Sequence, residues 1–483
     1  MSKSLVKNFM YNLVFQMVTL FIPLITVPYT SRILGKQGIG IYSYTLSIVQ
    51  YFIIIGTVGI SLYGNRSIAY VRDDKEKMSR VFWSITLFKF ITTAIALIVY
   101  IIMFCIKTEN SLIYLIQSTN IVAAALDISW LYMGLEDFKK TVTRNLLIKL
   151  IGVVCIFLFI KSYDDLYEYI AINGLMLVFG NLIMWAYVPN TVSFIAVTYT
   201  DMKQHFIPAM KLFIPQISVQ IYAVLDRTML GILSNTGEVG LYEQSQKIIR
   251  LVLGIVTSLG VVMLPRMSNT FSKGDNNKLK EYLNKSLKAI AYISIPMATG
   301  LAAISKELVP WFFGKDFYEV SYLLILSSAS LVFIAIGNVL GMHYLLPSNR
   351  TREFTIAVTV GAISNVIINL LLIGKYKAQG ACIATLISEF LVAYIQYLFI
   401  KQSIDGSMII NIVKYIVAAF LMFVTVRLIG YSLGAAVFTT FIQSIIGAAV
   451  YVLILVLLKE EINHLLTSII GSYRYKLKRL LRK

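Results

Sequence analysis

Long apolar runs without charged residues recur along the whole chain, and they decide what it can fold into. The longest are 169–200, 320–349 and 428–458, and a helix that crosses a bilayer needs about 20 mostly apolar residues. Over 483 residues the chain is 58% hydrophobic and 14% charged, whereas soluble proteins are about 45–50% apolar and about 25% charged. The sequence therefore predicts a membrane protein and excludes a soluble enzyme.

Runs of spanning length recur about fourteen times, which predicts an all-α polytopic membrane protein with about 14 transmembrane helices. Twelve or thirteen helices are left open, because Arg144, Lys149 and Lys414 interrupt two of the runs. The predicted spans are 9–34, 39–63, 82–106, 111–135, 142–161, 169–189, 209–233, 240–264, 286–305, 320–345, 354–374, 378–400, 407–430 and 435–458.

Basic residues set the expected orientation. The chain has 43 Lys and Arg against 24 Asp and Glu, a net charge of +19, and most of the basic residues fall in the termini and in every second predicted loop. Because cytoplasmic loops carry the excess of Lys and Arg, both termini are expected in the cytoplasm. The segment 459–483 reads as a basic amphipathic tail on an anionic membrane surface, and no domain for nucleic-acid binding is present.

Two short motifs return 200 residues apart with the same spacing. The segment 39–42 returns as 239–242, and Arg66 returns as Arg266. Because six predicted spans separate the copies, both have the same membrane orientation, as in a parallel repeat. The predicted domains are an N-terminal lobe (1–200, helices 1–6) and a C-terminal lobe (201–400, helices 7–12) around a central cavity, two extra helices (401–458) and the tail (459–483).

Charged residues inside the spans point to that cavity, because an ionisable side chain in lipid is costly and usually faces a bundle interior or water. Glu243, Lys247 and Arg250 are spaced to share one helical face. The repeat relates them to Ser43, Ser47 and Gln50, which are polar but uncharged. The expected polar lining of the cavity is Tyr42, Ser43, Ser47, Gln50, Tyr242, Glu243 and Gln246.

These charges have two readings. Structural ion pairs, such as Glu243 with Lys247 and Asp226 with a neighbour, would only hold helices together. An anionic ligand would instead pair the basic residues that remain, since unpaired buried charge is costly. Lys89 and Asp127 are expected either to form an ion pair or to leave Asp127 as a coupling-ion site. Lys211 and Arg427, near span ends, are expected to extend their charged groups to the interface.

Motifs typical of ATPases and of metal-dependent enzymes are missing from the sequence. No Gly-x4-Gly-Lys-Ser/Thr loop is present, so ATP hydrolysis by this chain is not expected. The three histidines are isolated, and no metal and no cofactor are expected. Predicted loops outside the membrane leave no room for a catalytic module, and we expect the protein not to be an enzyme.

Three segments resemble a known family: 28–42, 127–138 and 213–216. Pro28-Tyr29-Thr30-Ser31-Arg32, Asp127-Ile128-Ser129-Trp130 and Phe213-Ile214-Pro215-Gln216 are similar to the flippases for polysaccharide repeat units, which belong to the multidrug/oligosaccharidyl-lipid/polysaccharide exporter superfamily. The resemblance implies a cation-lined cavity between two six-helix lobes, with helices 13 and 14 accommodating a lipid tail. By this resemblance, the candidate residues for substrate binding are Arg32, Arg227, Lys247 and Arg250.

The implied substrate is an undecaprenyl-diphosphate-linked oligosaccharide, moved from the cytoplasmic to the outer leaflet of the bacterial plasma membrane for capsule or a similar surface polymer. Membrane lipids and a polysaccharide polymerase are the implied partners. A proton or a sodium ion is left open as coupling ion, with Asp127, Asp226 and Glu389 as candidate sites. Three alternatives stay open: a lipid II flippase, a drug/cation antiporter of the same superfamily, which the basic excess opposes, and a membrane enzyme of polysaccharide assembly.

Overall fold

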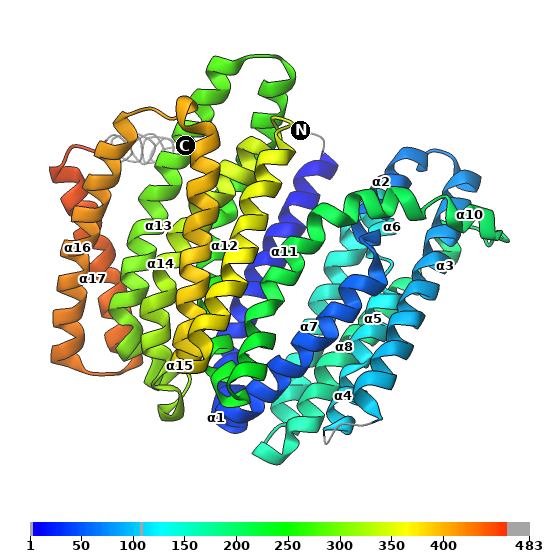
Figure 1. Ribbon diagram of the computed structural model, residues 1–483, viewed down its shortest axis with the longest axis horizontal. Coiled ribbons are helices and arrows are strands. Elements are labelled where there is room, and N and C mark those ends of the chain that lie inside the picture. Colours follow the sequence, from blue (N-terminus) through cyan, green and yellow to red (C-terminus); the bar gives the residue numbers. More distant parts are fainter. Residues whose placement is uncertain (1–2, 107–109, 461–483) are drawn as a thin grey trace, which may run out of the picture. The chain divides into compact units, whose positions relative to one another are not determined.

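The computed structural model describes residues 3–106 and 110–460, and these residues form helices and no strand. Short 3-10 or π-helical turns lie at 101–105, 163–165, 315–317, 339–345 and 401–403. The α-helices, labelled in Figure 1 where space allows, are α1 (Lys3–Thr57), α2 (Ile60–Val71), α3 (Lys75–Tyr100), α4 (Ser111–Gln117), α5 (Thr119–Leu126), α6 (Ser129–Gly134), α7 (Phe138–Phe159), α8 (Leu166–Trp185), α9 (Val188–Thr191), α10 (Tyr199–Lys203), α11 (Phe206–Leu233), α12 (Thr236–Ser272), α13 (Asn276–Phe312), α14 (Val320–Asn338), α15 (Thr351–Ile400), α16 (Ser407–Leu433) and α17 (Val437–Leu457).

The all-α membrane fold predicted from the sequence is confirmed. Among the described residues, ten helical stretches are long and apolar enough to cross a membrane. Two of these, Phe21–Val71 and Thr351–Ser403, are more than 50 residues long, and each contains a break in the helix, at Gly35 and at Lys377. Both breaks fall between predicted spans, at 34/39 and at 374/378. The count of fourteen spans remains a prediction.

The described chain divides into two compact units, Met1–Glu243 and Gln244–Lys483. In the first unit α1 packs against α3, α5, α7 and α11, and α8 packs against α5 and α7. Buried aromatic residues, among them Phe82, Trp130 and Tyr132, form one of its cores together with aliphatic side chains. The predicted lobes 1–200 and 201–400 stay a prediction, and the tail 459–483 lies outside the described residues except for Lys459 and Glu460.

The repeated glycines meet in the first unit, where α1 crosses the start of α12. A Cβ added to Gly40 would lie 1.6 Å from the carbonyl oxygen of Thr236, and one added to Gly240 would lie 2.0 Å from that of Lys36. The contact is therefore reciprocal between positions that differ by 200. Thr236 also donates a hydrogen bond to Gln37 Oε1 at 2.9 Å. Only glycine allows two backbones to approach this closely.

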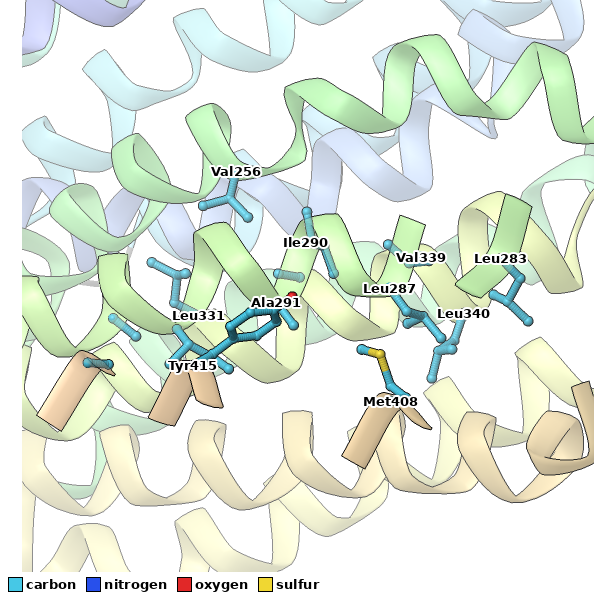
Figure 2. Close-up of a cluster of buried hydrophobic side chains, with 14 of the residues drawn as sticks. Val256, Leu283, Leu287, Ile290, Ala291, Leu331, Val339, Leu340, Met408 and Tyr415 are labelled. Carbon is cyan, nitrogen blue, oxygen red and sulfur yellow. The ribbon is translucent and has the colours of Figure 1, made fainter. Parts of the chain in front are cut away.

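Helix α13 is central to the second unit. It packs against α14, α16 and α17, and α14 packs against α15; Figure 1 shows these helices running side by side. Figure 2 shows the core around α13, where Leu287 and Ile290 lie among side chains such as Leu331, Val339 and Tyr415. Apolar residues on the outer faces, such as Leu371 and Ile445, stay largely exposed, as expected of side chains that face lipid.

Candidate functional site

Two acidic and one basic residue of the predicted site come together in the first unit, together with a tyrosine. Asp226 and Arg227 are near the end of α11, and Tyr242 and Glu243 are in the second turn of α12. Tyr242 donates a hydrogen bond to Asp226 Oδ2 at 2.5 Å, and Arg227 Nε lies 3.5 Å from Glu243 Oε2. We call these four residues the α11–α12 cluster. Both carboxylates are buried, with 6% of each residue exposed.

Helix α1 extends this polar region with hydroxyl groups. Ser47 and Thr228 share a hydrogen bond of 2.8 Å, and Tyr51 donates to the Thr228 hydroxyl at 3.1 Å. Ser43 is buried, and the ring of Tyr42 packs edge-on against Tyr169, with centroids 5.1 Å apart. Gln50 is half-buried. The structure thus brings most of the predicted polar residues of the first unit together; their lining of a cavity stays a prediction.

The other predicted site residues of α12 belong to the second unit. Gln246 is buried and donates to the Ser327 hydroxyl at 3.2 Å, Lys247 is half-buried, and Arg250 is exposed. Arg32, on α1 of the first unit, is also exposed. The four predicted phosphate-binding cations therefore divide between the units, and their convergence on one ligand stays a prediction.

The ion pair of Arg227 changes how that residue can act. The sequence prediction treated Arg227 as a cation available to a ligand, and it considered Lys247 as the partner of Glu243. In the structure Glu243 lies beside Arg227, so a phosphate that binds Arg227 has to compete with a carboxylate. At 3.5 Å the pair is longer than a charge-assisted hydrogen bond of about 2.7–2.9 Å.

The predicted span 111–135 corresponds to one apolar helical stretch, Ser111–Gly134, which is interrupted at Ser118, between α4 and α5, and at Asp127 and Ile128, between α5 and α6. Side chains from other helices satisfy the carbonyl groups that the break between α5 and α6 releases, as a membrane interior requires. Asn181 donates to the carbonyl of Ala123 at 2.6 Å, and Trp185 donates to that of Leu126 at 2.8 Å. Arg144 in turn donates to the side-chain oxygen of Asn181.

Lys89 also stabilises the break between α5 and α6. Its ammonium donates to the backbone carbonyl of Asp127 at 2.5 Å, while the Asp127 carboxylate accepts from the amide of Ser129 at 2.9 Å. The predicted ion pair between the two side chains is therefore replaced by a bond from lysine to backbone. Lys89 is 2% exposed. Asp127 as a coupling-ion site stays a prediction, as does Glu389, which is half-buried on α15.

Sequence reasoning missed an acidic residue that anchors the second unit. Glu307, placed in a predicted loop, is the buried partner of Arg427, whose Nη1 lies 2.9 Å from Oε2. Gln443 also donates to this carboxylate at 3.3 Å. The expectation that Arg427 extends to the interface stays a prediction, and the structure adds that its guanidinium pairs with Glu307 on α13. A carboxylate 120 residues away offers no local signal.

A second buried carboxylate lies at the C-terminal end of the described residues. Glu460 is 1% exposed; it accepts a hydrogen bond from Tyr415 at 2.9 Å and lies 3.4 Å from Lys288 and 3.7 Å from Lys414. Lys414 interrupts a predicted span, and this pairing explains how its charge is accommodated. Among the described residues no group of histidine, cysteine and acidic side chains could hold a metal ion.

An apolar groove of about 410 Å³ lies in the second unit. Its lining comes from α12, α13, α16 and α17 and is almost entirely apolar, with small residues such as Gly300 and Gly447 between larger ones such as Met297 and Met422. Few polar groups are present, so the groove suits a hydrocarbon chain better than a charged or sugar ligand.

Comparison with known protein families shows that the chain is similar to transporters. A family model described as "Polysaccharide biosynthesis protein" matches residues 5–271, and one described as "Lipid II flippase MurJ" matches residues 176–460. A protein of Escherichia coli named "Putative O-antigen transporter" is 25% identical over 411 residues, which cover 83% of this chain and 97% of that protein. A protein of the same name from Shigella dysenteriae is 23% identical and covers 77% and 93%.

Solved structures show the same fold. A structure of the lipid II flippase MurJ in an inward closed conformation superposes with a TM-score of 0.77 at 16% identity, over 95% of this chain and 99% of that one. An inward-facing multidrug resistance transporter of the MATE family superposes with a TM-score of 0.64 at 12% identity, over 80% and 97%.

Proposed function

The chain belongs to the polysaccharide biosynthesis protein family, as a flippase, and on that premise we propose that it moves an undecaprenyl-diphosphate-linked oligosaccharide from the cytoplasmic to the outer leaflet. The match of family models along residues 5–460 carries this proposal. The sugar is destined for capsule or another surface polysaccharide, although the curated relatives are named for O-antigen. The protein acts in the bacterial plasma membrane, with both termini in the cytoplasm, and supplies substrate to a polymerase.

The α11–α12 cluster gives this transport a physical basis. A diphosphate needs cationic partners, and Arg32, Arg227, Lys247 and Arg250 are the residues that provide them. In this proposal, a phosphate that binds Arg227 displaces the Glu243 carboxylate as a partner of the guanidinium. Asp226, a candidate site for the coupling ion, belongs to the same cluster and accepts a hydrogen bond from Tyr242.

The apolar groove is the proposed place of the polyprenyl tail. It lies among α12, α13, α16 and α17, and its lining is almost free of polar groups. A tail there remains in hydrocarbon surroundings while the sugar crosses between the lobes. The diphosphate then moves outward with the membrane potential, which favours an anion leaving a negative interior by about 2.3 kcal/mol per charge per 100 mV.

The proposal is tested with purified protein in vesicles that contain a fluorescent undecaprenyl-diphosphate oligosaccharide. Lys247→Ala and Arg250→Ala are each expected to reduce the flipping rate at least tenfold at normal protein levels. Arg352→Ala is the matched control, because Arg352 is an exposed cation outside the proposed site and its loss should leave the rate unchanged. Full activity of both test variants contradicts the cationic-site assignment.

A lipid II flippase is the second candidate, because the lipid II flippase family model matches more than half of the chain. Vesicles that contain lipid II in place of the oligosaccharide substrate separate the two functions by relative rate. A membrane enzyme of polysaccharide assembly is tested in the same vesicles with a radiolabelled sugar, because transport leaves the sugar covalently unchanged and an enzyme alters it.

A further inference from the structure

The turn between α12 and α13 contains a polar cavity that the proposed transport path does not use. The cavity measures about 500 Å³ and lies wholly in the second unit. Helix α12 contributes its last two turns, and α13 contributes its first two turns. The lining residues are Arg266, Asn269, Thr270, Lys273, Asp275, Lys278 and Tyr282. We call it the α12–α13 pocket.

The pocket has a strong positive charge. Its lining contains three basic residues and a single carboxylate. Asp275 already accepts a hydrogen bond from the amide of Lys278 at 3.0 Å, as the N-cap of α13. Within residues 3–106 and 110–460, no carboxylate lies at ion-pair distance from Arg266, Lys273 or Lys278. Charge of this kind around a concave site favours an anionic ligand.

The repeat offers an internal control for this charge. The hairpin of α2 and α3 corresponds to that of α12 and α13: Arg66 matches Arg266, and Asp74 caps α3 as Asp275 caps α13. In the first unit, however, the equivalent arginine donates to Tyr70 at 2.8 Å.

Two other basic residues of the first hairpin have acidic partners. Arg72 pairs with Glu136 at 2.9 Å, and Lys77 lies 3.1 Å from Asp74. Hydrogen bonds from Lys77 hold the pKa of Asp74 below its usual value. A general preference for positive cytoplasmic loops would affect both hairpins alike, so it does not by itself explain why three basic residues of the second hairpin line one cavity.

We propose that the α12–α13 pocket binds the diphosphate of the polyprenyl-linked substrate at the cytoplasmic leaflet, before the substrate enters the transport path. This inference rests on the proposed function. Arginine can hold two phosphate oxygens at once, and the lysines add point charges. The amide of Asn269 and the hydroxyl of Tyr282 remain for the first sugar, and a cavity of this size is within the range of small-ligand sites.

The first test measures binding alone, by native mass spectrometry of the full chain in detergent. The probes are undecaprenyl diphosphate, phosphatidylglycerol and inorganic diphosphate. The double variant Arg266→Gln/Lys278→Gln is expected to weaken binding of undecaprenyl diphosphate about 25-fold, because each basic residue near a membrane surface contributes about fivefold. Lys280→Gln is the control, since it removes the same charge from the same helix outside the pocket.

The second test separates this pocket from the transport site. In vesicles, the double variant should raise KM by a similar factor and leave kcat within twofold, because the pocket acts before the transport step. Unchanged binding, or phosphatidylglycerol binding as tightly as undecaprenyl diphosphate, overturns the proposal, and so does a loss of kcat with unchanged KM. Inorganic diphosphate that binds equally well shows a site for soluble anions and also overturns it. Wild-type protein that binds but does not flip contradicts the proposed function, while the binding measurement still supports the pocket.

Discussion

The reciprocal contact of Gly40 and Gly240 allows a quantitative prediction for Gly240→Ala. The added Cβ would lie 2.0 Å from the carbonyl oxygen of Lys36, whereas real Cβ contacts essentially never fall below 3.0 Å. Helices α1 and α12 must therefore separate by about 1 Å or more, and both partners are backbone, which cannot rotate away. Overpacking of this kind costs about 1–3 kcal/mol in the free energy of unfolding.

The measurement is the free energy of unfolding in mixed micelles, followed by tryptophan fluorescence. Gly254→Ala is the matched control, because Gly254 is on the same helix and nothing lies within 4 Å of its added Cβ; it should be neutral or stabilising by up to about 1 kcal/mol. The double variant Gly40→Ala/Gly240→Ala should cost less than the sum of the single variants, since one separation accommodates both methyl groups. Wild-type stability of Gly240→Ala, or strict additivity, refutes the close crossing.

Three other substitutions test individual interactions by the same unfolding measurement. Lys89→Met removes the donor from the carbonyl of Asp127 and should cost about 1–3 kcal/mol; wild-type stability would show that the helix break does not need this bond. Glu307→Gln leaves Arg427 without its counter-charge and should cost about 2 kcal/mol, the lower end for a partly exposed pair. An equal loss in Glu307→Gln and in the double variant with Arg427→Gln would contradict the unpaired charge of Arg427 as the cause. Burial lowers the pKa of His205 below its usual 6.5, so protonation opposes folding and stability should fall as the pH drops below about 6.5; His205→Gln should flatten this pH dependence, and an unchanged slope would assign it elsewhere.

The apolar runs predicted the helices well, because the length of a membrane helix is imposed by the bilayer. The break at Gly35 also lies where the sequence placed a loop, between spans ending at 34 and beginning at 39. The break at Asp127 could not be predicted, since the donors that stabilise it come from residues far away in the sequence, such as Lys89 and Trp185. Locally, the segment 111–135 is still apolar enough to cross a membrane.

For the charged residues of the candidate site, the sequence likewise predicted only what depends on local spacing. Spacing along α12 predicted one polar face of Glu243, Lys247 and Arg250, of which Glu243 is buried, Lys247 is half-buried and Arg250 is exposed. It could not identify Arg227 as the partner of Glu243, since that pairing depends on how α11 meets α12. Glu307 and Glu460 were assigned to a loop and to the tail for a related reason: hydropathy places residues by their neighbours in sequence, whereas their burial depends on distant basic residues.

The buried polar contacts differ in how easily a ligand could replace them. The interactions of Lys89 with Asp127 and of Arg427 with Glu307 are 2.5–2.9 Å long, so an exchange would break short charge-assisted bonds. The Nε atom of Arg227 lies 3.5 Å from Glu243 Oε2, which is longer than a charge-assisted hydrogen bond of about 2.7–2.9 Å. The proposed flippase needs some cations that hold its helices and others that exchange partners with its cargo, and we expect Arg227 to be of the second kind.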